Sequence, residues 1–472
     1  MSHVTVTPRS PIKTEIIAMW TLSWPMLIAQ LASVGMGVAD VAMTGHVGAA
    51  DLAAVALGSS LWSIVMVTVM GIMMAINAMV AHDVGAGSLT RIPHLVRQGL
   101  WMGLGVGIVA CVLINLGTLV FDHLALDPSV RDQATLYVHI ISTGLLPFAV
   151  CRALYGYSTS LNQTKPIMLI SLGALALNIL MNWLLIYGYW GMPKLGALGC
   201  AVATSISMWL MLGAMWCWIR RAPAYRASYP FGQREGARWS AIKPMLKMGL
   251  PIGITYFAEV SAFGAVALLV ARFGVITLSA HQIALNFVSL VFMVPLSVGI
   301  ALSTRVGQAL GEGDPIRARF VAWVGVGMAV VFGLLSAAGI ALFRHQIAAA
   351  YTSDPAVQAL TAHLLLFAAF FQLSDSTQVA AASAIRGYKV TRSPMVIHLA
   401  AFWGFSLPLG CVLGLAPSWL PWGPVVALEA TGFWIGLVLG LTVASLLLVW
   451  FLHRLSWRRV QVHGVAPANL AL

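Results

Sequence analysis

The stretch GLPIGITYFAEVSAF, residues 249–263, places one carboxylate, Glu259, in a segment that is otherwise uncharged. The surrounding segment, 245–271, is long enough to cross a bilayer, because about 20 apolar residues in a helix span the hydrocarbon core. Similar segments recur through the 472-residue chain, in which 60% of residues are hydrophobic and 8% are charged. We therefore predict an all-α polytopic membrane protein with twelve transmembrane helices.

The predicted spans fall into two sets of six, separated by one long polar segment. The sequence therefore predicts four regions: an N-terminal lobe 1–219, a cytoplasmic linker 220–244, a C-terminal lobe 245–454 and a cytoplasmic tail 455–472. The spans are expected at residues 16–42, 52–80, 95–120, 133–157, 166–188, 196–219, 245–271, 278–304, 319–343, 357–384, 394–415 and 425–452.

The basic residues indicate how these spans are oriented. With a cytoplasmic N-terminus, 21 of the 26 Lys and Arg residues fall in cytoplasmic segments, 4 fall in outer loops, and Arg152 lies near the inner end of the fourth span. Such an excess is typical of cytoplasmic loops. We therefore expect a multi-pass membrane protein with both termini cytoplasmic. Topology also accounts for the net charge of +12, so no nucleic-acid partner is expected.

The two halves repeat each other. Pro25 in SWPMLIAQ matches Pro251 in GLPIGITY at an offset of 226, and Gly85 matches Gly311 at the same offset. Because each repeat holds an even number of spans, both halves have the same orientation. We therefore predict two six-helix bundles related by a pseudo-two-fold axis along the membrane normal, an arrangement known in transporters.

Three acidic residues lie within predicted spans: Asp40, Glu259 and Asp375. A carboxylate in the hydrocarbon region costs at least ~2.5 kcal/mol and usually faces a cavity or a partner. Counting the helical rise places Glu259 and Asp375 at similar depth in the second half, and Asp40 in the outer half of the first span. At the repeat offset, Asp40 and Glu259 correspond to Val266 and Ser33, so the charges are not duplicated.

No Lys or Arg within the spans is expected to neutralise these acids, because Arg152 is placed too near the cytoplasm. A proton, a metal cation or a cationic ligand would lower the cost of the charge. We therefore hypothesise that Glu259 exchanges one cation for another. A sodium site at Glu259 and Asp375 is one form of this hypothesis, in which Ser374 and Thr377 supply further oxygens.

Several neighbouring side chains are candidates for lining a cavity. Phe263 lies one helical turn after Glu259, on the same face. Two pairs of amides have i,i+4 spacing, and mid-span amides either line cavities or bond helices together. The pairs are Asn178 with Asn182 in the fifth span and Gln282 with Asn286 in the eighth.

The chain resembles the multidrug and toxic compound extrusion (MATE) transporters, in their bacterial NorM-like branch. The opening stretch carries this resemblance together with GVADVAMTGHVGAADLAAVALGSS (37–60), LNILMNWLLIYG (177–188), LSAHQIALNFVSL (278–290) and FQLSDSTQVAAASAIRGY (371–388). It implies two six-helix bundles around a central cleft. It also implies export of small organic cations across the bacterial inner (plasma) membrane in exchange for inward H⁺ or Na⁺, without a cofactor. We further expect a monomer in contact with membrane lipids.

The resemblance also assigns roles to residues. It implies that Asp40, Asn178, Asn182, Glu259 and Asp375 couple transport to the driving cation. It implies that the substrate contacts Gln282, with Phe263, Asn286 and Asp375 as further candidates. Some relatives carry a tyrosine where this chain has Phe371, which offers no oxygen to a cation.

Other functions compete with this interpretation. A flippase for lipid-linked saccharides belongs to the same broad superfamily, but handling an anionic pyrophosphate predicts basic residues in the central cleft. An intramembrane enzyme is not supported, because the spans contain no HExxH motif, no GxSxG motif and no nucleophile–base pair. A channel is disfavoured because the acids are confined to particular helices of two equivalent halves.

Overall fold

The computed structural model describes residues 11–123, 127–416 and 426–464. Within these ranges, twelve helical segments are long and apolar enough to span a membrane, and they coincide with the twelve predicted spans. Most extend beyond the predicted ends, as in the first, which runs from Pro11 to Gly45. The prediction of an all-α membrane protein with twelve spans is confirmed.

The first half of the chain forms six spans, of which the fourth is interrupted between α4 and α5. Short 3₁₀ turns follow α3, α6 and α7. The helices of this half are α1 (Pro11–Gly45), α2 (Ala49–Gly85), α3 (Ile92–Gly117), α4 (Pro128–Ser142), α5 (Leu145–Ser160), α6 (Lys165–Tyr187) and α7 (Ala197–Arg221).

The second half forms six more spans, of which the eleventh contains a π-helical turn at Ala400–Ser406 between α12 and α13. Residues 455–464 of the predicted tail continue the last helix, and the remainder lies outside the described residues. The helices are α8 (Trp239–Val270), α9 (Val275–Gly311), α10 (Pro315–Tyr351), α11 (Pro355–Gly387), α12 (Arg392–Leu399), α13 (Leu407–Leu415) and α14 (Glu429–Gly464).

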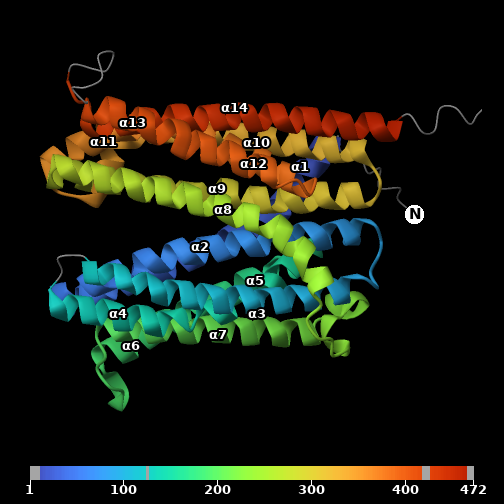
Figure 1. Ribbon diagram of the computed structural model, residues 1–472, viewed down its shortest axis with the longest axis horizontal. Helices are drawn as coiled ribbons and strands as arrows, with labels where there is room; N and C mark the ends of the chain where they lie inside the picture. The colour runs from blue at the N-terminus through green and yellow to red at the C-terminus, as the bar shows by residue number, and fades with distance from the viewer. Residues whose placement is uncertain (1–10, 124–126, 417–425, 465–472) are drawn as a thin grey trace, which may run out of the picture.

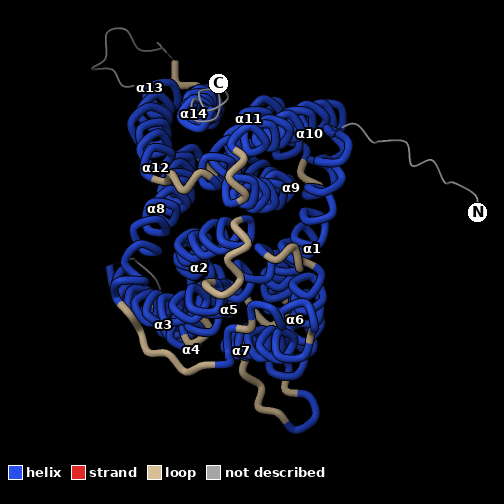
Figure 2. The backbone as a smooth tube through the Cα atoms, turned by 90° about the vertical axis from the view of Figure 1, so that its right-hand side faces the viewer, coloured by secondary structure: helices blue, strands red, loops and turns tan. Residues whose placement is uncertain are grey.

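The helices form two bundles, which lie one above the other in Figures 1 and 2. The equivalent helices α1 and α8 each begin against the opposite bundle. Met19 of α1 packs with Leu302 and Leu448 in the core of the second bundle. Ile242 and Met245 of α8 belong to the core of the first bundle. Each lobe core therefore includes the start of the other half's first helix.

The two bundles meet closely where α2 ends and α9 ends, which we name the closed end. Thr304 and Asn77 are hydrogen-bonded across the bundles, with 3.1 Å between the Thr304 oxygen and the Asn77 amide nitrogen. Gln308 of α9 donates to the Ser160 carbonyl at 2.9 Å. These buried contacts join helices of both halves at the end of the molecule where the described chain begins and ends.

An ion pair and two glycines complete the closed end. Glu15 of α1 accepts two hydrogen bonds from Arg305 of α9, at 2.7 and 2.8 Å. A Cβ on Gly85 would lie 2.0 Å from the carbonyl oxygen of Gln308, and a Cβ on Gly311 would lie 2.0 Å from that of His82. Helices α2 and α9 therefore cross in backbone contact at two repeat-equivalent positions that only glycine can occupy.

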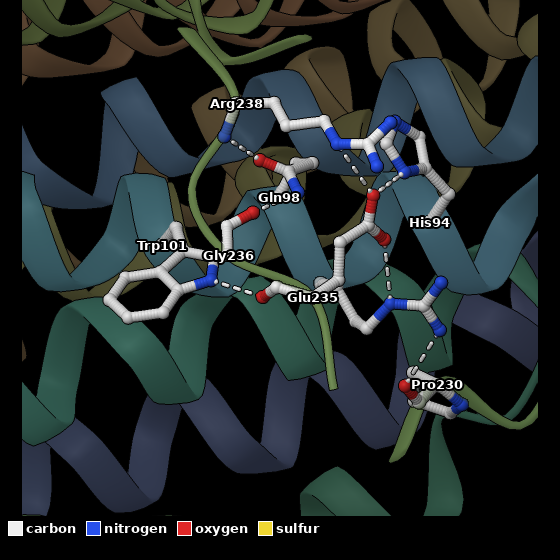
Figure 3. Close-up of polar contacts among 8 residues, drawn as sticks. His94, Gln98, Trp101, Pro230, Glu235, Gly236 and Arg238 are labelled. Carbon is white, nitrogen blue, oxygen red and sulfur yellow. Dashed lines mark hydrogen bonds and ion pairs between the residues drawn. The ribbon is translucent and has the colours of Figure 1, made fainter. Parts of the chain in front are cut away.

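The linker between the halves is fastened to α3 by a polar cluster, drawn in Figure 3. Glu235 accepts hydrogen bonds from Arg97 Nε at 2.9 Å and from His94 Nδ1 at 2.7 Å. Gln98 binds the linker backbone on both sides, donating to Gly236 and accepting from Arg238. Burial opposes ionisation, but the hydrogen bonds and charges of Arg97 and His94 prevail and lower the pKa of Glu235.

Candidate functional site

A cleft with a volume of about 980 Å³ lies between the bundles at the end opposite to the closed end. Both halves contribute to it, through the end of α1, the start of α2 and the start of α9. Asp40, Gln282 and Asn286 line it, together with Trp62 and Tyr137. Among the described residues that line this cleft, Asp40 is the one acid and none is Lys, Arg or His. The cleft therefore suits an apolar molecule with a positive charge.

Asp40 is buried and hydrogen-bonded at both carboxylate oxygens. Asn182 of α6 donates to Oδ1 at 2.6 Å, and Thr204 of α7 donates to Oδ2 at 2.9 Å. Asn178 donates to the Thr204 hydroxyl and accepts from Asn182, which closes a ring of four side chains. The structure thus brings together the acid and both amides that the sequence selected for the first half.

Thr204 is the member of this ring that sequence reasoning missed. A threonine in a span usually satisfies itself by bonding to a carbonyl of its own helix. Thr204 instead directs its hydroxyl across to α1 and α6. Thr204 and Met208, four residues apart, both line the cleft, so one face of α7 meets the cavity.

Glu259 and Asp375 form a second acidic region, within the other bundle. Glu259 of α8 and Asp375 of α11 are 8% and 1% exposed. They are near enough for the charge of Asp375 to repel a charge on Glu259. Within the described parts of the chain, Glu259 shows no hydrogen bond, while Asp375 accepts one from Gln378 at 3.1 Å. The sequence predicted that these two acids share one cavity; Glu259 lines a small pocket, and Asp375 is not among the described lining residues of that pocket.

A buried histidine extends this region. The Nε2 atom of His398 on α12 is hydrogen-bonded to the side-chain oxygen of Gln378. Its Nδ1 atom donates to the carbonyl of Pro394 at 2.7 Å. Gln378 and His398 line a small pocket together with Glu259. A chain of contacts therefore runs from Asp375 through Gln378 to His398, and the sequence analysis did not anticipate it.

The orientation of the Gln378 amide decides how it bonds to its two neighbours. As placed, its nitrogen donates to Asp375 and its oxygen faces the Nε2 atom of His398. With the amide turned over, a protonated Asp375 donates to the oxygen and His398 accepts from the nitrogen. Gln378 therefore couples the hydrogen bonding of Asp375 to that of His398.

Two further residues correct the expectation that the acids have no basic neighbour within the spans. Arg386, assigned from sequence to a cytoplasmic segment, is 8% exposed and lines the same pocket as Glu259. His398 lines it too. The last turns of α11 pack between the bundles, so residues near a helix end are buried. Neither residue forms an ion pair with Glu259 among the described contacts.

The predicted substrate residues separate into two places. Gln282 and Asn286 lie in the cleft, where Tyr351 donates to Asn286 at 2.9 Å. Phe263 instead belongs to an aromatic cluster, with its ring 5.9 Å from that of Phe371. Neither Phe263 nor Asp375 is among the lining residues of the cleft. Phe263 therefore packs against the core of its own bundle and not into the cleft.

The oxygens proposed for a sodium ion beside Asp375 are engaged elsewhere. Ser374 is hydrogen-bonded to Thr442 at 2.9 Å, and Thr377 donates to the Leu373 carbonyl of its own helix at 2.8 Å. Phe371 is packed among aromatic rings. This region of the described structure therefore offers two carboxyl groups to a cation but few additional oxygens.

Comparison with known proteins identifies the family. A family model described as MatE matches the chain twice, over residues 25–184 and 251–412, which confirms the repeat. The chain is 42% identical over 455 residues to the multidrug resistance protein PmpM of Pseudomonas aeruginosa, covering 96% of this chain and 94% of that one. It is 40% identical to the probable multidrug resistance protein NorM of Chromobacterium violaceum, covering 96% of each.

A solved structure agrees with these relatives. The crystal structure of the eukaryotic MATE transporter AtDTX14 covers 96% of this chain with a TM-score of 0.86, at 19% identity. At that identity the likeness shows a shared fold. The double match of the family model and the identity to the bacterial relatives show more: the chain belongs to the multidrug and toxic compound extrusion family, in its NorM-like branch.

Proposed function

We propose that this protein exports small organic cations from the bacterial cytoplasm in exchange for inward-moving protons, by alternating access. The observation that carries the proposal is the pair of buried carboxyl groups, Glu259 and Asp375, which have no ion-pair partner among the described residues. A proton on either acid removes the repulsion between the two charges, and its release restores that repulsion. Protonation of this pair can therefore drive the conformational change that carries a substrate held in the cleft.

The cleft supports a cationic substrate. Its walls combine Asp40 with aromatic and methionine side chains, and aromatic faces attract cations. Gln282 and Asn286 supply adjustable hydrogen bonds from the second half. A volume of about 980 Å³ accommodates molecules of many shapes, which suits a broad drug range.

The closed end supports alternating access. The excess of basic residues at this end supports a cytoplasmic position for it, and with that orientation the cleft faces outward. Substrate release to the outside corresponds to this conformation. Uptake from the cytoplasm then requires the contacts of Glu15 with Arg305 and of Asn77 with Thr304 to separate while the cleft closes. The two bundles would rock against each other around their pseudo-two-fold axis.

Protons suit the second acidic region better than sodium. Sodium must exchange its hydration shell for several oxygens, and Ser374 and Thr377 make their hydrogen bonds elsewhere. A proton requires one oxygen, and the contacts through Gln378 to His398 offer it a second position. A saccharide flippase is not favoured, because the described lining of the cleft lacks basic residues.

The test uses purified protein in liposomes loaded with ethidium. A pH gradient in the absence of Na⁺ is expected to drive its transport, and a Na⁺ gradient at equal pH is expected to drive it weakly. Transport driven by Na⁺ alone, with an inert proton gradient, would contradict proton coupling. No transport under either gradient, in protein shown to be folded, would contradict cation export.

A further inference from the structure

A second cavity lies between the bundles, on the closed-end side of the cleft, and its lining has the opposite charge. Arg152 of α5 and Arg386 of α11 both line it. Asn77 and Ser303 also line it, and these occupy equivalent positions of the repeat at the offset of 226. The cavity therefore lies near the pseudo-two-fold axis and is built by both halves. No Asp or Glu is among its described lining residues.

The guanidinium groups at this cavity are not matched by an anion of the protein. Arg386 donates to the Ser383 hydroxyl at 2.6 Å and to the sulfur of Met74 at 3.2 Å. A thioether is a weak acceptor. Arg152 lies over the Phe148 ring at 5.1 Å, and its Nε atom is buried without a hydrogen-bond partner. The described chain places no carboxylate within ion-pair distance of either arginine.

A third donor at the cavity is also unmatched. The hydroxyl of Ser303 is buried without a hydrogen-bond partner. Burying a charge without compensation is strongly unfavourable, and a buried donor left unmatched adds to that cost. Water accepts hydrogen bonds but leaves both positive charges uncompensated. A bound anion satisfies the charges and the donors together.

We propose that this cavity binds one small monovalent anion, such as chloride, between Arg152 and Arg386. The cavity volume of about 40 Å³ corresponds to about three water molecules, which fits a single halide ion and excludes a drug or a sugar phosphate. Because the ligands come from both bundles, the anion stabilises the conformation with the closed end formed. It also holds the Arg386 charge away from Glu259, with which Arg386 shares a pocket.

The test measures thermal unfolding of the full-length protein in detergent, by the fluorescence of its 17 tryptophans. Chloride replaces gluconate at constant cation concentration and ionic strength. A saturable rise in the melting temperature with chloride and with bromide is expected, because a ligand that binds only the folded state stabilises it. A response that does not saturate, or that sulfate reproduces, would overturn the site. Acetate tests whether a carboxylate can replace the halide.

Variants test whether the rise in melting temperature with chloride arises at this cavity. Arg152→Gln and Arg386→Gln should each abolish the saturable rise, while the exposed Arg226→Gln should retain it. Ser303→Ala keeps both charges and removes one unmatched donor, so it should raise the half-saturating chloride concentration several-fold even if the arginine variants do not fold. A chloride response that is unchanged in Ser303→Ala and in whichever arginine variants fold would overturn the proposal.

Discussion

The two halves share a scaffold but treat their buried carboxylates differently. Asp40 in the first half receives hydrogen bonds at both oxygens, from Asn182 and Thr204. In the second half, Glu259 receives none among the described residues, and its neighbour Asp375 receives one. Asp40 thus has hydrogen-bond partners at both oxygens beside the cleft, whereas Glu259 is left without a partner among the described residues. Under the proposed function, we expect the first half to contribute to substrate binding and the second half to coupling.

Neutralising the two acids of the second half is expected to have the largest effect. We expect Glu259→Gln and Asp375→Asn each to reduce proton-driven export at least about tenfold, equivalent to ~1.4 kcal/mol in the barrier. The reason is that an amide cannot take up and release a proton. Transport in liposomes, normalised to the amount of folded protein, measures the effect. Wild-type rates in both variants would remove these residues from coupling.

Neutralising the first half should have a smaller effect on coupling. Asp40→Asn is expected to weaken substrate export severalfold, roughly 1 kcal/mol, because the cleft loses its one described acid. The dependence of transport on the imposed pH gradient should persist. Thr204→Val, which leaves the charge but removes one donor, serves as the matched control and should reduce export less. Loss of the proton response in Asp40→Asn would show that both halves couple.

A histidine distinguishes the second acidic region from the described ring around Asp40, which contains none. His398→Gln keeps a polar partner for Gln378 but has no titratable group. We expect proton-driven export to fall roughly threefold to fivefold, and its variation with pH to become shallower. The pH profile is the decisive measurement. A uniform loss at every pH would indicate a packing role instead.

The smallest effect is expected at a fourth carboxylate, Glu235, in the linker between the halves. Because the pKa of Glu235 is lowered, its ionised form stabilises the folded protein above the unfolded-state pKa, and that contribution is lost as pH falls through the folded-state pKa. Glu235→Gln should therefore reduce the free energy of unfolding by about 0.5–1 kcal/mol at pH 7 and lower the melting temperature slightly. The difference from wild type should narrow as pH falls through the folded-state pKa. Export should be unaffected.

The fold could be read from the sequence because membrane insertion is encoded locally. Span length, the excess of inner basic residues and the 226-residue offset depend on short stretches of chain and needed no packing information. The acids could be found for the same reason, because a charge within a membrane-spanning segment is costly whichever way its side chain faces. Glu259 and Asp375 could be paired because depth along a helix is set by residue count.

The rest depended on which helix faces which. Thr204, His398 and Arg386 are ordinary residues for their segments, and their roles arise from neighbours on other helices. Arg386 is near a helix end by count, yet the crossing of the bundles buries it. Phe263 shares a helical face with Glu259, but the path of α8 turns its ring into the aromatic core. Tertiary packing decides such positions, and counting residues along one helix does not reveal the neighbours on other helices.

The glycine crossing of α2 and α9 makes the two halves mutually dependent. Each backbone carbonyl lies where the other helix would need a Cβ, so a methyl group on Gly85 or Gly311 forces the same separation of the bundles. Damage to one repeat therefore cannot be confined to that repeat. A substitution at either glycine is therefore expected to open the same contact between the bundles. The two halves remain alike at this crossing, although their buried acids differ.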